Sequence, residues 1–545
     1  MPTFKTPLIG SYNQRSFVTP SGKDQYVKGA IITRIVNKQS NSATYYTEKR
    51  GGLTAITTPA SGQTAVAAYV STGTGAKYTI FSSAGTLTLY KDVDFQGTLL
   101  TSGTNSSALM SSETLIDGIT YILMTARDES ANPQTGWYLA SDANTTNFTA
   151  NRTSGNVQLA SVSSFTGRYV GQLLTGTGIA AGARIASMNV GGATIDMTIA
   201  ATSGAATATT ITPEAVSKII DADFPTLTIG TFAEMDGFVC IITTTGRVYN
   251  SDLNTVASWS ASNYILCNKY SDGGLGLFRY RNRFLAFNNA SLELLYNAGN
   301  ASGSPFNSGD EAVFSVAMPP PNPGMVAQAD GNVFWVGADG NLYRMEGFSP
   351  KKVSALGTDI TSSNFVGGFA AGSMTAFYYN RKTYLNIKVS ASINYWYSVD
   401  DDTFSEPNFP ASAYCGCTFT GLFFALANTG GKIYSLSTSA FQDNGAAFTM
   451  SIQLAIDMGT QGEKFLDEIR LIGDVQASGS LSISYSDDDG VTYSTPRLMS
   501  LTSQRTMSLK RWGSFMGTRL VKFEHSANTP FRAEQVAFIY RLGKR

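Results

Sequence analysis

Alternation of apolar and polar residues is the clearest pattern in this chain, and it has the period of a β-strand. Residues 481–485 read Leu-Ser-Ile-Ser-Tyr, the turn Asp-Asp-Asp-Gly follows at 487–490, and the alternation resumes at 491–493. An alternating run, a turn with Gly and a second alternating run predict a two-sided β-hairpin. The stretch carries no helix signal, and similar short runs fill the rest of the chain. An all-β architecture is therefore predicted.

Units made of an apolar strand, a Gly or Asn turn and a second strand that usually carries Tyr recur along the chain. Their spacing is roughly 40 to 55 residues, which is the period of propeller blades. We predict a β-propeller of six or seven blades, interrupted by insertions, with an array of β-sandwiches as the competing architecture. The units lie at 65–90, 120–139, 237–249, 283–296, 332–344, 376–387 and 422–436.

One segment breaks this rhythm. Between about 155 and 211 the aromatic residues nearly vanish, leaving Phe165 and Tyr169, while Ala, Thr, Gly and Ser dominate. Residues 171–182 resemble a small β motif that is common in phage tail and decoration proteins. A phosphate-binding loop is not predicted there, because no helix pattern and no Lys follow the glycines. We expect an inserted small β domain that projects outward.

The two ends of the chain are predicted to fold together. Residues 1 to about 60 contain two or three strands, which are too few to enclose a core of their own. We expect them to pair with the C-terminal strands, so that both termini build one β platform. The expected parts are 1–63 (N-terminal platform strands), 64–147 (first propeller blades), 148–213 (insert), 214–450 (remaining blades) and 451–545 (C-terminal platform).

Composition adds an expectation about the surface. Only 14% of the 545 residues are charged, against about 25% in an average soluble protein. Low charge fits a surface covered by other subunits, or a robust extracellular β protein. No apolar signal region occurs in residues 1–5 and no run of 18 apolar residues occurs anywhere. We therefore expect neither export by a signal peptide nor a membrane-spanning helix.

The charge of the chain sums to zero but is unevenly spread. Residues 497–545 hold ten basic and two acidic residues, a local net of +8, which leaves −8 for the remainder. A basic tail on an acidic body suggests a charged partner, such as an acidic neighbouring ring or nucleic acid. An ordinary solvated face with a basic terminus is the alternative.

Catalytic and metal chemistry find little support in the residues. His525 is the only histidine, and we expect it at a surface or interface, since it ends an alternating strand. The triplets 400–402 and 487–489 are expected to be tight turns, because neither has the spacing of a calcium loop. Glu293 with Asp310 or Glu311 is the only pair that can be nominated for a glycosidase, and no spacing selects it. We expect no enzyme activity, no cofactor and no bound metal.

The four cysteines are Cys240, Cys267, Cys415 and Cys417. Cys415 and Cys417 are too close for an ordinary disulfide and lack the spacing of zinc or redox sites. Buried thiols in a protein that folds in a reducing cytosol are the preferred interpretation.

Three passages resemble one protein family. They are the Tyr-x-x-Lys-x-Gly-Gly passage at 46–52, residues 276–306 with Ser-x-Glu-x-x-Tyr-Asn-x-Gly and Pro-Phe, and residues 464–532 with Ser-Asp-Asp-Asp-Gly, Leu-Lys-Arg-Trp-Gly and Pro-Phe-Arg. Together they resemble the tail nozzle, or packaged-DNA stabilisation, proteins of short-tailed double-stranded DNA phages. The resemblance touches most of the chain except the insert.

The resemblance implies a structural virion protein that is made in the host cytoplasm. Its members form a homohexameric tube below the portal and the adaptor ring, which closes the DNA exit channel, retains the packaged genome and opens for ejection. The implied partners are the adaptor, tail fibres or a tail needle, and double-stranded DNA in the lumen. We expect the −8 body to face that lumen more than the +8 tail does, because many phosphate contacts would slow the DNA.

The interface candidates are Arg511, Trp512, Lys510 and Arg532. Trp512 is expected to be a packing anchor and Arg511 an ion-pair or interface residue. Two alternatives stay open. The insert could bind a receptor, a host surface or a carbohydrate, with glycan cleavage as a lesser possibility, or the chain could be a cellular propeller scaffold.

Overall fold

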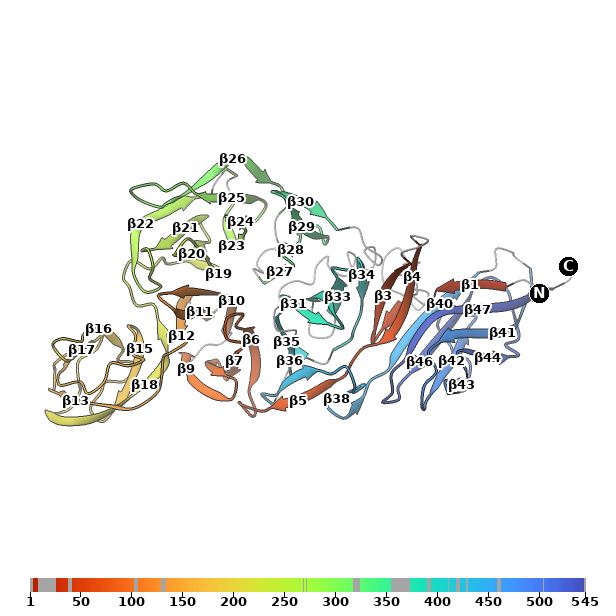
Figure 1. Ribbon diagram of the computed structural model, residues 1–545, viewed down its shortest axis with the longest axis horizontal. Helices are drawn as coiled ribbons and strands as arrows, with labels where there is room; N and C mark the ends of the chain where they lie inside the picture. Colours follow the sequence, from red (N-terminus) through yellow and green to blue (C-terminus); the bar gives the residue numbers. More distant parts are fainter. Residues whose placement is uncertain are drawn as a thin grey trace.

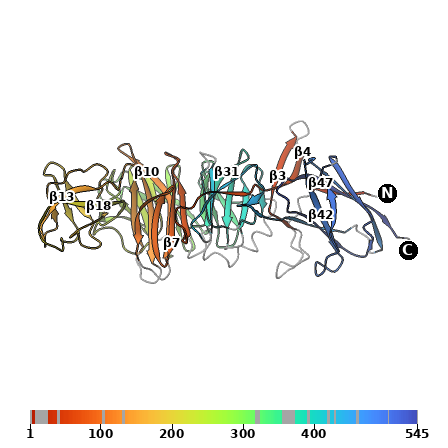
Figure 2. The ribbon, with the colours of Figure 1, turned by 90° about the horizontal axis from the view of Figure 1, so that it is seen from below.

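The computed structural model consists of β-strands and loops, with no helix in the residues it describes. Three parts lie in a row in Figure 1: the insert, a propeller and the platform, where both chain ends lie. The view from below shows the same order (Figure 2). The described residues are 3–7, 26–37, 42–101, 106–128, 134–267, 269–270, 272–316, 324–353, 373–389, 394–409, 411–417, 422–427, 430–457, 462–502 and 504–543.

Seven antiparallel sheets of the described strands surround the propeller centre (Figure 1). We number them in chain order by their innermost strands. Sheet 1 is β6 (Thr64–Val70), β7 (Lys77–Ser83), β8 (Thr86–Lys91) and β9 (Asp94–Leu100); sheet 2 is β10 (Ser106–Ile116), β11 (Ile119–Asp128), β12 (Thr135–Ala140) and β18 (Ala206–Lys218); sheet 3 is β19 (Thr228–Met235), β20 (Phe238–Thr243), β21 (Arg247–Ser251) and β22 (Trp259–Leu266).

The remaining four sheets complete the circle. Sheet 4 is β23 (Gly274–Tyr280), β24 (Arg283–Asn288), β25 (Leu292–Asn297) and β26 (Phe306–Phe314); sheet 5 is β27 (Val326–Ala329), β28 (Asn332–Val336), β29 (Leu342–Glu346) and β30 (Ser349–Lys352). Sheet 6 is β31 (Ser373–Tyr379), β32 (Lys382–Lys388), β33 (Asn394–Ser398) and β34 (Thr403–Ser405); sheet 7 is β35 (Ala411–Cys417), β36 (Leu422–Ala427), β37 (Ile433–Leu436) and β5 (Leu53–Thr57).

The sequence of each propeller sheet explains its place. Second strands such as β24 and β28 are buried almost throughout, because sheets cover both of their faces. Side chains of sheets 4 and 5, among them Phe287 and Trp335, form one shared cluster. Sheet 7 closes the circle by taking its fourth strand, β5, from the N-terminal side of the propeller. Strands from both ends of the propeller are therefore held in one sheet.

The insert leaves the propeller between the third and fourth strands of sheet 2. It contains β13 (Phe148–Arg152), β14 (Gln158–Leu159), β15 (Gln172–Gly176), β16 (Ile185–Asn189) and β17 (Thr194–Met197). The long strand β18 pairs with β13 along its first half and with β15 along its second half, and its C-terminal end also pairs with β12. Its own small core includes Phe148, Ile185, Ile195 and Ile211.

The platform is a sandwich of two sheets built from both ends of the chain. One sheet holds β1 (Thr3–Pro7), β3 (Ala30–Asn37), β4 (Ser42–Lys49), β41 (Lys464–Gly473), β44 (Thr506–Lys510), β45 (Ser514–Phe515) and β47 (Arg532–Leu542). The other holds β2 (Tyr26–Lys28), β40 (Met450–Ile456), β42 (Ser480–Ser486), β43 (Arg497–Ser500) and β46 (Arg519–His525).

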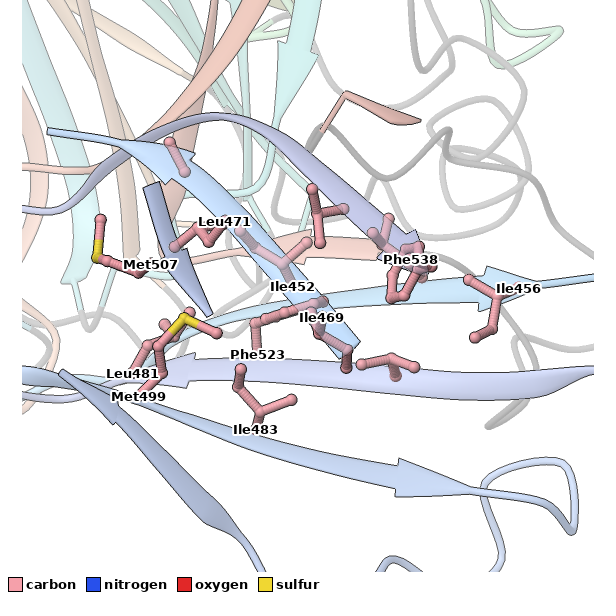
Figure 3. Close-up of a cluster of buried hydrophobic side chains, with 14 of the residues drawn as sticks. Ile452, Ile456, Ile469, Leu471, Leu481, Ile483, Met499, Met507, Phe523 and Phe538 are labelled. Atoms are coloured by element: carbon pink, nitrogen blue, oxygen red, sulfur yellow. The ribbon is translucent and has the colours of Figure 1, made fainter. Parts of the chain in front are cut away.

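Alternating side chains from the two platform sheets meet in one core, as Figure 3 shows for Ile469, Phe538, Ile483 and Phe523. The side chains that point inward are the apolar ones of the alternating pattern, as expected where two sheets pack face to face and form a core between them. The predicted fold class is confirmed: an all-β chain with a propeller, a platform formed by both termini and an inserted small β domain.

Candidate functional site

The turn that follows β44 contains three of the four interface candidates. Trp512 is buried, with 2% of its surface exposed, and its ring meets Tyr485 edge-on at a centroid distance of 6.4 Å. Its indole Nε1 donates a hydrogen bond to the Leu509 carbonyl at 2.8 Å. The Arg497 guanidinium lies 4.6 Å from the centre of the Trp512 ring. Trp512 thus packs into the platform core, close to the edge strand β44.

A buried ion pair fixes this turn to the Asp-Asp-Asp-Gly loop. Arg519 is 1% exposed in its side chain and binds both oxygens of Asp487, at 2.6 and 2.7 Å. The same guanidinium donates to the carbonyls of Trp512 and Ser514 at 2.7 and 2.8 Å. Two parts of the C-terminal signature are therefore joined by one arginine. Nothing in the sequence around Arg519 marks it as a buried side chain with an acidic partner.

Lys510 and Arg511 are exposed at the same edge. Lys510 pairs across the sheet with Glu468, whose carboxylate binds Arg470 at 2.7 Å. Arg511 has a φ of +67°, a conformation that L-residues with long side chains rarely adopt. Among the residues that the structure describes, no acidic side chain forms an ion pair with Arg511.

Arg532 lies apart from the other three candidates. Its guanidinium is 4.0 Å from the centre of the Tyr46 ring and 3.7 Å from Asp474. Trp512 bonds to Leu466 near one end of β41, whereas Arg532 is next to Gly473 at the other end. Seven residues of strand separate these points, or roughly 23 Å. The candidates therefore form one cluster of three residues and one separate residue.

Acidic residues of the same domain cancel most of the basic tail. Residues 451–496 hold eight acidic and two basic residues, so residues 451–545 together have a net charge of only +2. A net charge of +2 attracts an acidic partner ring less strongly than the local sum of +8 suggested. Any such attraction is confined to the edge with Arg497, Lys510 and Arg511. The pairs that take up the other charges are Arg505–Glu534, Arg519–Asp487, Lys522–Glu524, Arg532–Asp474 and Arg541–Asp467.

A second arginine joins the propeller to the platform. Arg50 is fully buried, and its five N–H groups donate to both oxygens of Asp443 and to the carbonyls of Pro407, Asn408 and Gly51. Its guanidinium lies between two aromatic rings, 4.3 Å from Phe409 and 3.7 Å from Phe448. Asp443 belongs to the small hairpin of β38 (Gln442–Asp443) and β39 (Ala446–Ala447).

Gly51 and Gly52 explain the rest of this N-terminal passage. A Cβ at Gly51 would lie 1.8 Å from the Ser437 carbonyl oxygen, and one at Gly52 would lie 2.1 Å from the Gln442 carbonyl oxygen. Only glycine allows the chain to pass this close to another backbone. The Lys-Arg-Gly-Gly sequence is therefore the joint between the two large parts. In the sequence alone, this passage is marked only by its resemblance to a protein family.

A cavity of about 500 Å³ occupies the centre of the propeller. Its charged residues are engaged with their own neighbours: Arg279 pairs with Glu234 at 2.8 Å, and Glu113 accepts hydrogen bonds from Ser71 and the backbone of Thr72. Asp330 also lines the cavity and accepts a hydrogen bond from Thr383 Oγ1 at 3.1 Å. The charged side chains that line the cavity are thus held by contacts within the fold.

His525 contradicts its expected position. It is fully buried in β46, where its Nε2 lies 3.2 Å from Thr529 Oγ1 and its ring packs against Phe531. Burial, and to a smaller extent the nearby Lys49, lowers its pKa to about 4. The prediction of a surface histidine is wrong because the alternation that ends β46 places residue 525 on the inner face.

The nominated carboxylates have structural partners. Glu293 is fully buried, its Oε1 accepts the backbone N–H of Lys269 at 3.0 Å, and burial raises its pKa. The side chains of Asp310 and Glu311 lie outside the described residues. In the triplets, Asp401 binds Lys382 at 2.6 Å and Asp488 accepts the backbone N–H of Thr492 at 2.9 Å, as expected of turns.

The described residues form no cluster suited to a metal ion, and the cysteines whose side chains are described are free. Within the described ranges, no group of three or more His, Cys, Asp or Glu residues is placed to hold a metal ion. Cys240 and Cys267 are buried free thiols, and the side chains of Cys415 and Cys417 lie outside the described residues. In the part of the chain that is described, no helix is long and apolar enough to cross a membrane.

Comparison with known proteins gives fold likenesses only. No protein-family model and no curated protein matches the sequence. Among solved structures, the chain is similar to one in the mitotic checkpoint complex, with 7% identity, coverage of 71% of this chain and 93% of the other, and a TM-score of 0.33. BBS1N in complex with ARL6DN gives 9%, 72%, 99% and 0.35, and BamB from Moraxella catarrhalis gives 10%, 75%, 98% and 0.32. These likenesses carry no argument about function.

Proposed function

We propose that this protein is a structural subunit of the tail nozzle of a short-tailed double-stranded DNA phage. In this role it assembles into a homohexameric ring or tube below the portal and adaptor, retains the packaged genome and opens for ejection. The basis is the resemblance of the three passages to that family. Tail fibres or a needle, and DNA in the lumen, are the further partners that it implies.

The structural roles of the resembling residues support this proposal. Gly51 and Gly52 lie at the joint between the propeller and the platform, and two parts of the C-terminal passage, the Asp487 loop and the Trp512 turn, are joined to each other through Arg519. Residues that join two particular structural elements would have no such role in a protein that lacks those elements. The resemblance therefore lies in positions on which this architecture depends.

The observation that carries the assembly role is the platform edge. Arg497 contacts the ring of the buried Trp512 and donates to the carbonyls of Lys510 and Arg511, whose side chains are exposed. Arginine beside a buried aromatic residue is typical of protein interfaces. This edge therefore supports the proposal of a contact with another protein chain.

Mass measurement tests the proposal directly. Native mass spectrometry and sedimentation velocity of the purified chain should show six copies, or a ring once an adaptor is supplied. A chain that remains monomeric with the adaptor present, at all accessible concentrations, contradicts the nozzle role. Arg511→Glu should weaken assembly, whereas Arg505→Glu, which changes an exposed arginine at the other end of β41, should leave assembly unchanged.

A second candidate function rests on the insert, which is unusually poor in charge. Residues 148–213 contain only four charged residues, and Arg152, Arg168 and Arg184 each donate to backbone carbonyls. The insert is also firmly attached, since the Tyr138 hydroxyl donates to the Val170 carbonyl at 2.6 Å. An attached projection with few charged residues fits a receptor- or carbohydrate-binding arm. Replacing 148–213 with a short linker should then abolish adsorption to cells and preserve assembly.

A further inference from the structure

The turn between β23 and β24 places an arginine in a strained backbone conformation. Sheets 2, 3 and 5 use Asp-Gly at this turn, at 117–118, 236–237 and 330–331, and each Asp has a positive φ. Sheet 4 has Arg281-Asn282, with Arg281 at a φ of +54°, and sheet 6 has Asn380-Arg381, with Arg381 at +64°. A long side chain is unfavourable in that conformation, so the surroundings of the sheet 4 arginines decide whether they serve a partner.

Aromatic rings hold the arginines of this turn in place. The Arg281 guanidinium is 5.1 Å from the centre of the Tyr280 ring, and that of Arg283 is 5.0 Å from Tyr296 and 5.6 Å from Phe348. Phe348 comes from the neighbouring sheet 5, packs edge-on against Tyr280 and remains 43% exposed. Stacking fixes a guanidinium plane while its N–H groups stay available for a carboxylate. We call these five residues the sheet 4 patch.

The charges around the patch restrict its partner. Within the described residues, no carboxylate forms an ion pair with Arg281 or Arg283. Nearby, however, Glu346 pairs with Arg344 and Lys351, and Asp236 accepts a hydrogen bond from Asn297. These carboxylates would repel a continuous run of phosphates. A short acidic segment with an apolar residue beside it suits the patch better, because it can place one side chain on Phe348 and its charges on the arginines.

The chain itself carries a segment of this kind. The loop 487–491 reads Asp-Asp-Asp-Gly-Val, and Val491, at 81%, is the most exposed of the large hydrophobic side chains among the described residues. Hydrogen bonds from Thr492 hold the pKa of Asp488 at about 2, so this carboxylate stays ionised. Arg519 anchors the base of the loop through Asp487. The loop is thus a fixed, acidic projection with an apolar tip.

We propose that the sheet 4 patch binds the 487–491 loop of a second copy of this chain. Val491 packs against Phe348, and the acidic residues face Arg281 and Arg283. The contact joins two different surfaces, so it is heterologous and propagates from copy to copy until a ring closes. It rests on the proposed function in that it gives the nozzle subunit one specific contact with its neighbour.

A charge exchange tests this contact with little risk to folding. Arg281→Asp with Asn282→Gly installs the Asp-Gly pair that sheets 2, 3 and 5 already use, and reverses the charge. Asp489→Lys reverses the charge of one acidic residue of the loop. Each variant alone should weaken self-association by about tenfold or more, as loss of a complementary charge contact does. The combination should return within about threefold of the wild type. Sedimentation velocity over a concentration series gives the constants.

The matched control is Asn380→Asp with Arg381→Gly, which changes the corresponding turn of sheet 6 and also removes a positive charge. It should associate as the wild type does. If the wild type associates and the sheet 4 variant matches it, the docking contact is overturned and the ring proposal stands. The same holds if both single variants weaken association and the combination gives no recovery. A wild type that is monomeric even with an adaptor overturns both proposals.

Discussion

Asparagine in place of Asp443 tests whether the buried pair with Arg50 holds the propeller to the platform. Arg50 is completely buried, and Asp443 supplies the only negative charge among its five described hydrogen-bonding contacts. Asp443→Asn keeps the shape of the side chain but removes that charge. It also turns an NH2 group towards the guanidinium. A buried cation is then left with carbonyls and aromatic rings alone.

The expected cost follows from burial. Breaking a buried ion pair by removing one partner costs about 3–5 kcal/mol, because the remaining charge is neither paired nor hydrated. The pair Asp467–Arg541 provides a matched comparison, since its two contacts of 2.7 and 2.9 Å are as short, yet Arg541 is 59% exposed in its side chain. An exposed pair of this kind is worth about 0.2–1 kcal/mol. Asp467→Asn should therefore be nearly neutral.

Hydrogen exchange is the suitable assay, because a chain with several domains does not unfold in one step. Amides on both sides of the joint, in 46–53 and 441–450, should exchange faster in Asp443→Asn by about two orders of magnitude or more, since each 1.4 kcal/mol is a factor of ten. Amides of the insert core should be unaffected. Equal exchange at the joint in Asp443→Asn and Asp467→Asn would refute the idea that Arg50 locks the two parts together.

Three further predictions concern individual positions. The pKa of His525 in the folded chain, about 4, is below the ordinary 6.5, so the unfolded chain binds the proton more readily; platform stability should fall by up to about 3 kcal/mol as the pH drops from 6.5 to 4, and His525→Gln should flatten this dependence in urea titrations. Gly51→Ala should cost more than about 3 kcal/mol or prevent soluble expression, because its Cβ would meet a carbonyl, whereas Gly204→Ala, with open space around it, should be tolerated. Trp512→Ala should lower platform stability by about 3–5 kcal/mol, and Arg511→Gly should raise it slightly by relieving a positive φ, which thermal unfolding can compare.

The fold was predictable from the sequence because its signals are local. Strand alternation around Ile483 and the Asp-Gly turn at 236–237 depend on residues that are neighbours in the chain. The exchange of strands between distant segments, as in the pairing of β5 with β37, has no such signal. The platform could still be inferred, because strands of 1–63 that cannot form a core alone must join another sheet.

The candidate site was less predictable, because its chemistry depends on partners that are far apart in sequence. Arg50 and Asp443 are separated by 393 residues, and nothing near either one marks a buried charge. His525 was misplaced for a different reason: it shares the face of Val521 and Phe523, which the alternation marks as inner and which lie in the core between the two platform sheets, but a polar residue at a strand end was expected to be exposed. The charge of the C-terminal tail was likewise misjudged from a segment whose acidic partners precede it.

The contacts of the buried arginines explain how a chain with few charged residues keeps its structural elements in a fixed arrangement. The buried arginines Arg50 and Arg519 do not contribute to a charged surface. Each binds a carboxylate, several backbone carbonyls and two aromatic rings. These contacts fix the relative positions of segments that strand pairing alone would not determine. Arg281, Arg381 and Arg511 are exposed at turns with a positive φ, and no carboxylate of the described residues forms an ion pair with them. In the proposed assembly the two groups of arginines therefore have different roles, since the buried ones would fix the subunit and the exposed ones would be free to meet its neighbours.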